Sequence, residues 1–164
     1  MEVRNAANPT DVKNYTTDRL RKEFHIPKLF EKDKVKMVYS HIDRIITAGF
    51  MPVEQELKLE AGKELAAEYF LERRKMGCIN IGGKGFITVD GTEYAMNSRD
   101  GIYIGKGNKD ITFKSKNPEE PAKFYVSSCP AHCTYPIRHI DITKAKKVPC
   151  GSVPLYLMIL SRSW

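Results

Sequence analysis

The sequence lacks the two features that mark membrane and secreted proteins. No apolar run among its 164 residues approaches the ~20 residues that span a bilayer. The first residues, MEVRNAANPTDVKN, contain no apolar core of the kind found in secretory signals. We therefore expect no membrane partner and a cytoplasmic location.

Cysteine is also scarce. The four cysteines, Cys78, Cys129, Cys133 and Cys150, are too few and too unevenly spaced for a secreted disulfide framework. A chain of 164 residues that is 41% hydrophobic is long enough for one domain with a substantial core. The composition is that of an ordinary soluble globular protein.

The charge is moderately basic but not patterned for nucleic acid. Lys and Arg number 27 and Asp and Glu 20, which gives a net charge of +7. Basic residues mostly alternate with acidic ones, as in EKDKVK, and no basic stripe is interleaved with aromatic residues. No nucleic-acid partner is expected. A field that attracts acidic substrates and a merely solvated surface both remain open.

Phosphate-binding glycine loops are missing as well. GGKG at residues 82–85 lacks the G-x-G-x-x-G spacing, and GKG at residues 105–107 lacks the Ser or Thr that follows a P-loop lysine. Both clusters are predicted to be turns between strands.

What the sequence does contain is a series of short strand-like runs. Residues 1–15 are polar and indicate an arm, and residues 16–26 predict a short helix with Leu20 and Phe24 one turn apart. Further runs rich in β-branched and aromatic residues, or alternating in polarity, predict strands at 35–46, 53–61, 66–72, 77–82, 85–96, 100–105, 110–115 and 122–128. Asp90-Gly91 is a strong hairpin signal. The series predicts an antiparallel sandwich or barrel.

Two segments have the spacing of the metal-binding motifs of cupin barrels. In G-x5-H-x-H-x4-E-x6-G, two histidines one residue apart project from the same face of a strand. Gly62 and Gly82 frame the first motif here, but Glu68 and Phe70 stand at the histidine positions and Lys75 at the carboxylate position. In the second motif, Gly105 is in place, Tyr103 replaces proline and Asn108 replaces the third histidine. The spacing indicates a cupin scaffold without its ligands.

A longer resemblance supports this interpretation. The segments MVYSHIDRII, YFLERRKMGCINIGGKGFITVDG, YIGKG, PAKFY and PAHCTYP, in this order, resemble the first half of the 5-keto-4-deoxyuronate isomerases, also called 4-deoxy-L-threo-5-hexosulose-uronate ketol-isomerases. The resemblance extends to about Ser152. It implies ketol isomerisation of 4-deoxy-L-threo-5-hexosulose uronate to 3-deoxy-D-glycero-2,5-hexodiulosonate in pectin and uronate degradation. It also implies two tandem cupin-like barrels, an acidic-sugar substrate and a cytoplasmic homo-oligomer, a hexamer in the family.

The resemblance further implies zinc, bound by three histidines and a glutamate in the second barrel of the family. This chain contains no H-x-H, and its last residues, VPLYLMILSRSW, depart from the family. We therefore expect a truncated form, interrupted near Ser152 or Val153, with no cofactor and no activity of its own. The alternative is a non-catalytic cupin-like module for acidic-sugar binding or oligomer assembly.

The expected fold is mainly β: a cupin-like antiparallel β-sandwich or jelly-roll barrel with a short N-terminal helix and arm. Residues 1–52 are expected to form the arm, helix and first strands, and residues 53–140 the degenerate barrel. Residues 141–164 are expected to be a linker and an aberrant apolar tail.

The predicted chemistry suggests substrate-binding residues. A ketol isomerisation requires a base, a group that stabilises an enediolate oxygen, and a cation for the substrate carboxylate, for which a bidentate arginine is well suited. We cannot assign catalytic residues from the sequence. The candidates for substrate binding are His41, Arg44, His132 and Tyr135. The alternatives are a satisfied strand histidine for His41 and a partner of Asp43, or a surface residue, for Arg44.

Two further candidates lie in the first cupin-like motif. Arg73 and Arg74 suit a uronate carboxylate, although an ion pair with Glu72 or Glu68 is the favoured interpretation. Burial of Glu68 would raise its pKa, but an outward-facing strand residue is preferred.

No metal site is expected in CPAHC, residues 129–133. Zinc needs four ligands, or three and water, and Cys129, His132 and Cys133 supply at most three. His132 and Cys133 would point to opposite sides of an extended strand, and Pro130 and Pro136 indicate a loop.

Overall fold

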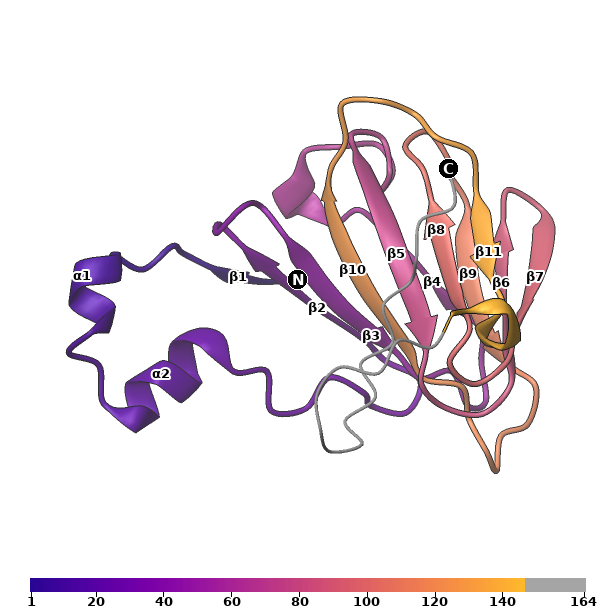
Figure 1. The fold of residues 1–164 in the computed structure, drawn as a ribbon, viewed down its shortest axis with the longest axis horizontal. Helices are drawn as coiled ribbons and strands as arrows, with labels where there is room; N and C mark the ends of the chain where they lie inside the picture. The colour runs from indigo at the N-terminus through magenta and orange to yellow at the C-terminus, as the bar shows by residue number, and fades with distance from the viewer. Residues whose placement is uncertain (147–164) are drawn as a thin grey trace.

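A computed structural model describes residues 1–146 of the chain as two β-sheets packed face to face (Figure 1). The predicted tail at residues 153–164 lies outside the described residues. All strand pairs within the two sheets are antiparallel except the pair between the first two strands. This confirms the predicted antiparallel β-sandwich.

The larger sheet has seven strands in the order β1-β2-β3-β10-β5-β8-β11. Their bounds are β1 Glu2–Arg4, β2 Val35–Ser40, β3 Ile46–Phe50, β10 Phe124–Pro130, β5 Arg74–Asn80, β8 Gly101–Ile104 and β11 Arg138–Ile140. Every second residue of β5 is buried, beginning with Arg74, because alternate side chains of a strand point to the same face. The other face of β5 carries exposed residues, so this sheet has one core face and one outer face.

The smaller sheet has four strands in the order β4-β9-β6-β7. Their bounds are β4 Leu57–Lys58, β9 Ile111–Ser115, β6 Gly85–Val89 and β7 Thr92–Met96. Asp90 and Gly91 join β6 to β7 with φ angles of 46° and 83°. Two successive left-handed residues are the signature of a type I′ turn, which confirms the predicted hairpin.

Aromatic contacts join the two sheets across the core. Phe113 of β9 stacks on Phe50 of β3 with ring centroids 4.1 Å apart, and its centroid is 5.3 Å from that of Phe124 on β10. All three rings are fully buried. Cys78 is also buried, and burial raises the pKa of its thiol.

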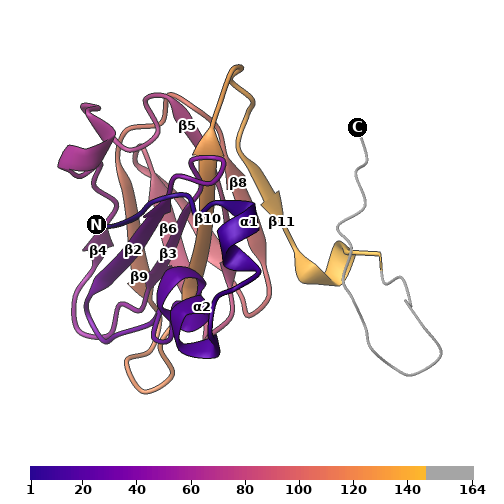
Figure 2. The same cartoon turned by 90° about the vertical axis from the view of Figure 1, so that its left-hand side faces the viewer.

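The helices are short and peripheral. α1 spans Pro9–Val12, α2 spans Thr17–Phe24, and the 3-10 turns η1 and η2 span Lys63–Leu65 and Ile142–Lys144. Neither α1 nor α2 contributes a buried residue, and both lie beyond the β1–β2 edge of the sandwich (Figure 1 and Figure 2). α2 confirms the predicted helix. No helix in residues 1–146 has the length and apolarity to cross a membrane.

Three strand predictions need correction. The run 35–46 is not one strand: β2 ends at Ser40 and β3 begins only at Ile46. The turn between them, in which Asp43 and Arg44 both have φ of 53°, breaks the extended backbone. The run 66–72 is not a strand, because Ala66 is left-handed (φ 45°) and Phe70 and Leu71 are buried side by side rather than alternately. Of the run 53–61, only Leu57–Lys58 forms a strand.

The division of the chain at residues 52 and 140 stays a prediction. β1, β2 and β3, which precede residue 52, belong to the same sheet as β10 and β5. Within the predicted arm, β1 pairs in parallel with β2, with Glu2 opposite Val38.

Candidate functional site

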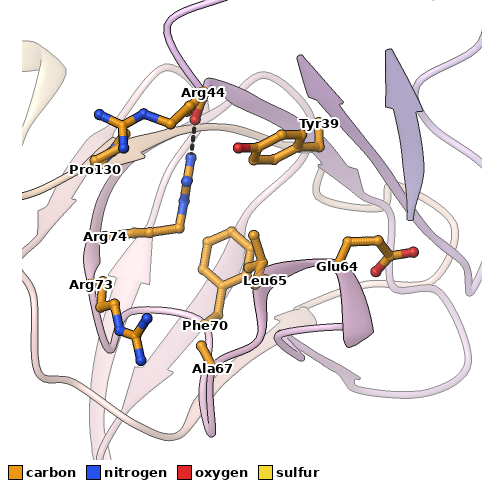
Figure 3. Close-up of a pocket in the computed structure, with 9 residues that line it drawn as sticks. All are labelled: Tyr39, Arg44, Glu64, Leu65, Ala67, Phe70, Arg73, Arg74 and Pro130. Atoms are coloured by element: carbon orange, nitrogen blue, oxygen red, sulfur yellow. Dashed lines mark hydrogen bonds between the residues drawn. The ribbon is translucent and has the colours of Figure 1, made fainter. Parts of the chain in front are cut away.

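A cavity of about 190 Å³ opens beside the start of β5. We call it the arginine pocket (Figure 3). Its walls come from five places: the end of β2, the β2–β3 turn, the η1 region with the turns that follow it, the start of β5 and the end of β10. Its lining residues are Tyr39, Arg44, Glu64, Leu65, Ala67, Phe70, Arg73, Arg74 and Pro130.

Arg74 is the one buried charged residue of this group and is only 7% exposed. Its position follows from the register of β5, because Arg74 is on the same inward face as Met76 and Cys78. Its Nε donates to Ser128 Oγ (3.1 Å), and its Nη2 donates to the backbone oxygens of Ser128 (3.0 Å) and Arg44 (2.6 Å). All three acceptors are neutral. Burial lowers the pKa of Arg74, although a guanidinium remains charged at any physiological pH.

Tyr39 provides a second wall around this guanidinium. The Arg74 Cζ lies 5.8 Å from the centre of the Tyr39 ring, within the range of a cation–π contact. The ring of His41 meets that of Tyr39 edge-on at 5.1 Å. The aromatic face therefore partly replaces the water that Arg74 loses on burial.

The β2–β3 turn carries the predicted candidates His41 and Arg44. Both are exposed, and His41 lies in the turn rather than on a strand, so the strand interpretation of His41 is wrong. The structure places Arg44 in the pocket lining, where its carbonyl binds Arg74. Among residues 1–146, Arg44 takes part in no salt bridge, so the predicted pair with Asp43 is not formed.

Arg73 and Arg74 behave differently. Arg73 Nη2 lies 3.1 Å from Glu72 Oε1, which confirms the predicted ion pair. The same interpretation is wrong for Arg74, which faces inward and has no carboxylate partner in the described part of the chain. Glu68 is exposed, as expected, but lies in a turn rather than on a strand.

The other two candidates, His132 and Tyr135, lie in the loop between β10 and β11, and both are exposed. Tyr135 lines a shallow open groove together with Tyr94, Lys106, Gly107, Asn108, Thr134, Pro136 and Ile137. The loop packs against the barrel at Gly105, where a Cβ would collide with the Tyr135 carbonyl oxygen. His41 and His132 line neither cavity, so the four candidates do not form one site.

The described residues do not fit a zinc ion. Nowhere in residues 1–146 do three or more His, Cys, Asp or Glu side chains come together in a group that could hold a metal. In CPAHC, Cys129 is half-buried at the end of β10, whereas His132 and Cys133 are exposed in the loop. The family's zinc, and the absence of any cofactor from this chain, stay predictions.

Sequence reasoning missed Tyr39 as a site residue and misjudged Arg74. The only local signal was the period of two in RKMGCIN, which places residue 74 on the face of residues 76, 78 and 80. Nothing in the sequence shows that Tyr39, 35 positions earlier, lies against the same guanidinium.

Comparison with known proteins shows the family to which the chain belongs. The model of the KduI/IolB family matches residues 24–154. A 4-deoxy-L-threo-5-hexosulose-uronate ketol-isomerase of Lachnoclostridium phytofermentans is 60% identical over 153 residues, which cover 93% of this chain and 55% of that protein. The enzyme of the same name from Dickeya dadantii is 46% identical over 153 residues, 92% of this chain and 55% of that protein. The chain thus spans about half the length of the curated relatives that it matches.

Solved structures also resemble the chain. The putative glyoxylate-induced protein of Pseudomonas aeruginosa aligns with 71% of this chain and 43% of its own, with a TM-score of 0.48 and 8% identity. A Cupin 2 conserved barrel domain protein from Salinispora arenicola aligns with 60% of this chain and 76% of its own, with a TM-score of 0.41 and 13% identity.

Proposed function

Because the chain belongs to the KduI/IolB family, we propose that it is part of an enzyme that isomerises 4-deoxy-L-threo-5-hexosulose uronate. The observation that carries this proposal is the 60% identity over 93% of the chain with an isomerase of that name. The product would be 3-deoxy-D-glycero-2,5-hexodiulosonate, and the enzyme class an intramolecular oxidoreductase.

The reaction moves a proton between two adjacent carbons through an enediol. It needs a base, a stabilising partner for the enediolate oxygen and a cation for the uronate carboxylate. The described residues offer cations, in Arg44, Arg73 and Arg74. They hold no metal-binding group, so we derive no step through the zinc that the resemblance implies.

We also propose that the protein works as a cytoplasmic homo-oligomer. Support comes from apolar side chains on the outer face of the larger sheet. Ile79 of β5 and Tyr125 of β10 are paired in register and remain 41% and 36% exposed, and Ile81 beside them is 54% exposed. Exposed apolar patches of this kind are typical of subunit contacts.

A segment exchange tests the proposed function. Residues 1–152 of this chain would replace the matching segment of the Lachnoclostridium phytofermentans enzyme, and NMR would follow conversion of the uronate. We expect turnover within about tenfold of the parent enzyme, a factor equivalent to ~1.4 kcal/mol. A chimera that folds and assembles like the parent but converts no substrate would refute the proposal.

A further inference from the structure

We propose that the arginine pocket is a binding site for a small organic carboxylate, with Arg74 Nη1 as its innermost hydrogen-bond donor. The proposal concerns binding in this half of the protein and assigns no catalytic role. It deepens the proposed function, because the choice of a carboxylate over other anions rests on the uronate named for the relatives.

The first argument comes from the donors of Arg74. A guanidinium has five N–H groups, and the three hydrogen bonds of Arg74 use the one on Nε and the two on Nη2. The two on Nη1 donate to no described residue. Nη1 is nevertheless not fully enclosed by protein. Among residues 1–146, the one side-chain polar atom that is both fully enclosed and without a hydrogen-bond partner is Tyr103 Oη. Nη1 therefore keeps accessible surface on a residue that lines the cavity.

The second argument is the charge of the lining. Three arginines and one glutamate give 3 − 1 = +2. Glu64, the glutamate, is 3.6 Å from the Met1 amino group, and its carboxylate points away from the arginines (Figure 3). Glu72 pairs with Arg73 from outside the lining. Neither Arg44 nor Arg74 has a carboxylate partner in the described structure.

An unpaired buried charge is costly, and the neutral acceptors around Arg74 compensate only part of its lost hydration. A ligand carboxylate at Nη1 would supply the missing partner through charge-assisted hydrogen bonds, which are shorter and stronger than neutral ones. Arg73 turns its guanidinium toward Phe70 and Ala67 (Figure 3), where it can approach the same ligand.

The third argument is size and wall chemistry. Ligand pockets usually measure about 300–1,000 Å³, so a cavity of about 190 Å³ suits a single sugar acid or a smaller molecule. Leu65, Ala67 and Phe70 form an apolar wall opposite the arginines. The pocket thus combines a cationic end with an apolar side, which fits a carboxylate attached to a compact carbon skeleton.

Calorimetric titration of the purified chain with D-galacturonate tests the proposal, with D-galactose as the matched neutral sugar and inorganic phosphate as a competing anion. We expect galacturonate to bind, added sodium chloride to weaken it, and galactose to give no signal. Arg74→Gln removes a charge-assisted hydrogen bond, so it should weaken galacturonate binding about tenfold or more.

Two further variants keep the test independent of the buried arginine. Arg73→Gln changes a side chain that is 72% exposed, and Ala67→Leu fills the cavity; each should weaken galacturonate binding about threefold to tenfold while the fold is retained. Arg138→Gln is the matched control, because Arg138 is exposed on β11 and lies outside the pocket lining.

Several results would overturn the site. Equal binding of galactose and galacturonate would show that the pocket does not recognise the carboxylate. Tighter binding of phosphate than of galacturonate would show that the site is not one for organic carboxylates. Equal losses of galacturonate affinity in Arg73→Gln and Arg138→Gln would show that binding depends only on the overall charge of the protein. Absence of binding in a chain whose chimera is an active isomerase would refute the site and leave the proposed function standing.

Discussion

Replacing Asn80 by aspartate should destabilise the fold more than any other change of one amide to a carboxylate in the described chain. Asn80 ends β5 and is fully buried. Its amide nitrogen donates to three backbone oxygens, and its oxygen accepts from two backbone N–H groups. The acceptors are Gly83 O (2.7 Å), Met96 O (3.0 Å) and Asn97 O (3.3 Å), and the donors are Gly82 N (3.1 Å) and Lys123 N (3.2 Å).

The magnitude follows from this arrangement. Asn80→Asp keeps the two accepted bonds but turns a second oxygen toward the three carbonyls. A buried carbonyl that loses its donor costs about 1–3 kcal/mol. Keeping the new carboxyl neutral at pH 7 costs a further ~1.4 kcal/mol for each unit by which burial raises its pKa. We expect a total loss of about 4 kcal/mol, a large part of the 5–15 kcal/mol typical of a domain.

Urea unfolding at pH 7 and pH 5 measures the loss. The carboxyl has a higher pKa in the folded than in the unfolded state, so its penalty grows as pH rises above the unfolded value and shrinks in acid. The matched control is Asn117→Asp, because the Asn117 side chain is exposed and its amide oxygen accepts one hydrogen bond, from Glu119 N, which a carboxylate can also accept. This substitution should change the free energy of unfolding by less than ~0.5 kcal/mol. An Asn80→Asp loss that matches the control, or that is the same at both pH values, would refute the reasoning.

Two other predictions concern the turn at Asp33 and the loop after β10. Asp33 Oδ1 accepts hydrogen bonds from Val53 N, Glu54 N and Gln55 N. These bonds, that from Val53 first, lower the pKa of Asp33. The stability that they contribute is present above the unfolded-state pKa and is lost as pH falls through the folded-state pKa. Asp33→Asn should therefore lower the urea midpoint at pH 7 and lose this effect in acid, and a midpoint difference that grows in acid would contradict it. Gly105→Ala should cost about 1–3 kcal/mol and speed tryptic cleavage at Arg138, because its Cβ collides with the Tyr135 carbonyl oxygen. Gly77→Ala, whose Cβ has no neighbour within 4 Å, is the control, and equal losses in the two variants would show that the loop contact is unimportant.

The parts of the fold that could be predicted are those whose signal is local. Asp90-Gly91 specifies its own turn, since both residues adopt left-handed conformations readily. The runs that became β9 and β10 alternate in burial as their sequences do. The β2–β3 turn could not be found in this way, because Arg44 has no intrinsic preference for its positive φ and no glycine or proline marks the reversal.

The site was harder to predict for a related reason. The arginine pocket brings together residues 39, 44, 64–74 and 130, and only the sheet order makes them neighbours. Arg74 looked like a surface ion-pair residue because Glu72 is two positions away. The period of two in β5 puts it on the inner face instead. Contact with Ser128 follows from the pairing of β10 with β5, and contact with the Arg44 carbonyl from the pairing of β10 with β3.

The place of β10 in the larger sheet also sets the order of events during synthesis. β10 is the partner of both β3 and β5, yet it follows β3 by more than 70 residues in the chain. Until Phe124–Pro130 has left the ribosome, β3 and β5 have no common neighbour and expose unpaired edges, with apolar side chains such as Ile46 and Met76 uncovered. Long-range pairings of this kind form slowly, and open edges are vulnerable to aggregation. Folding of the barrel is therefore a late event that follows translation of nearly all of the described chain, and chaperones have their main opportunity to act before it.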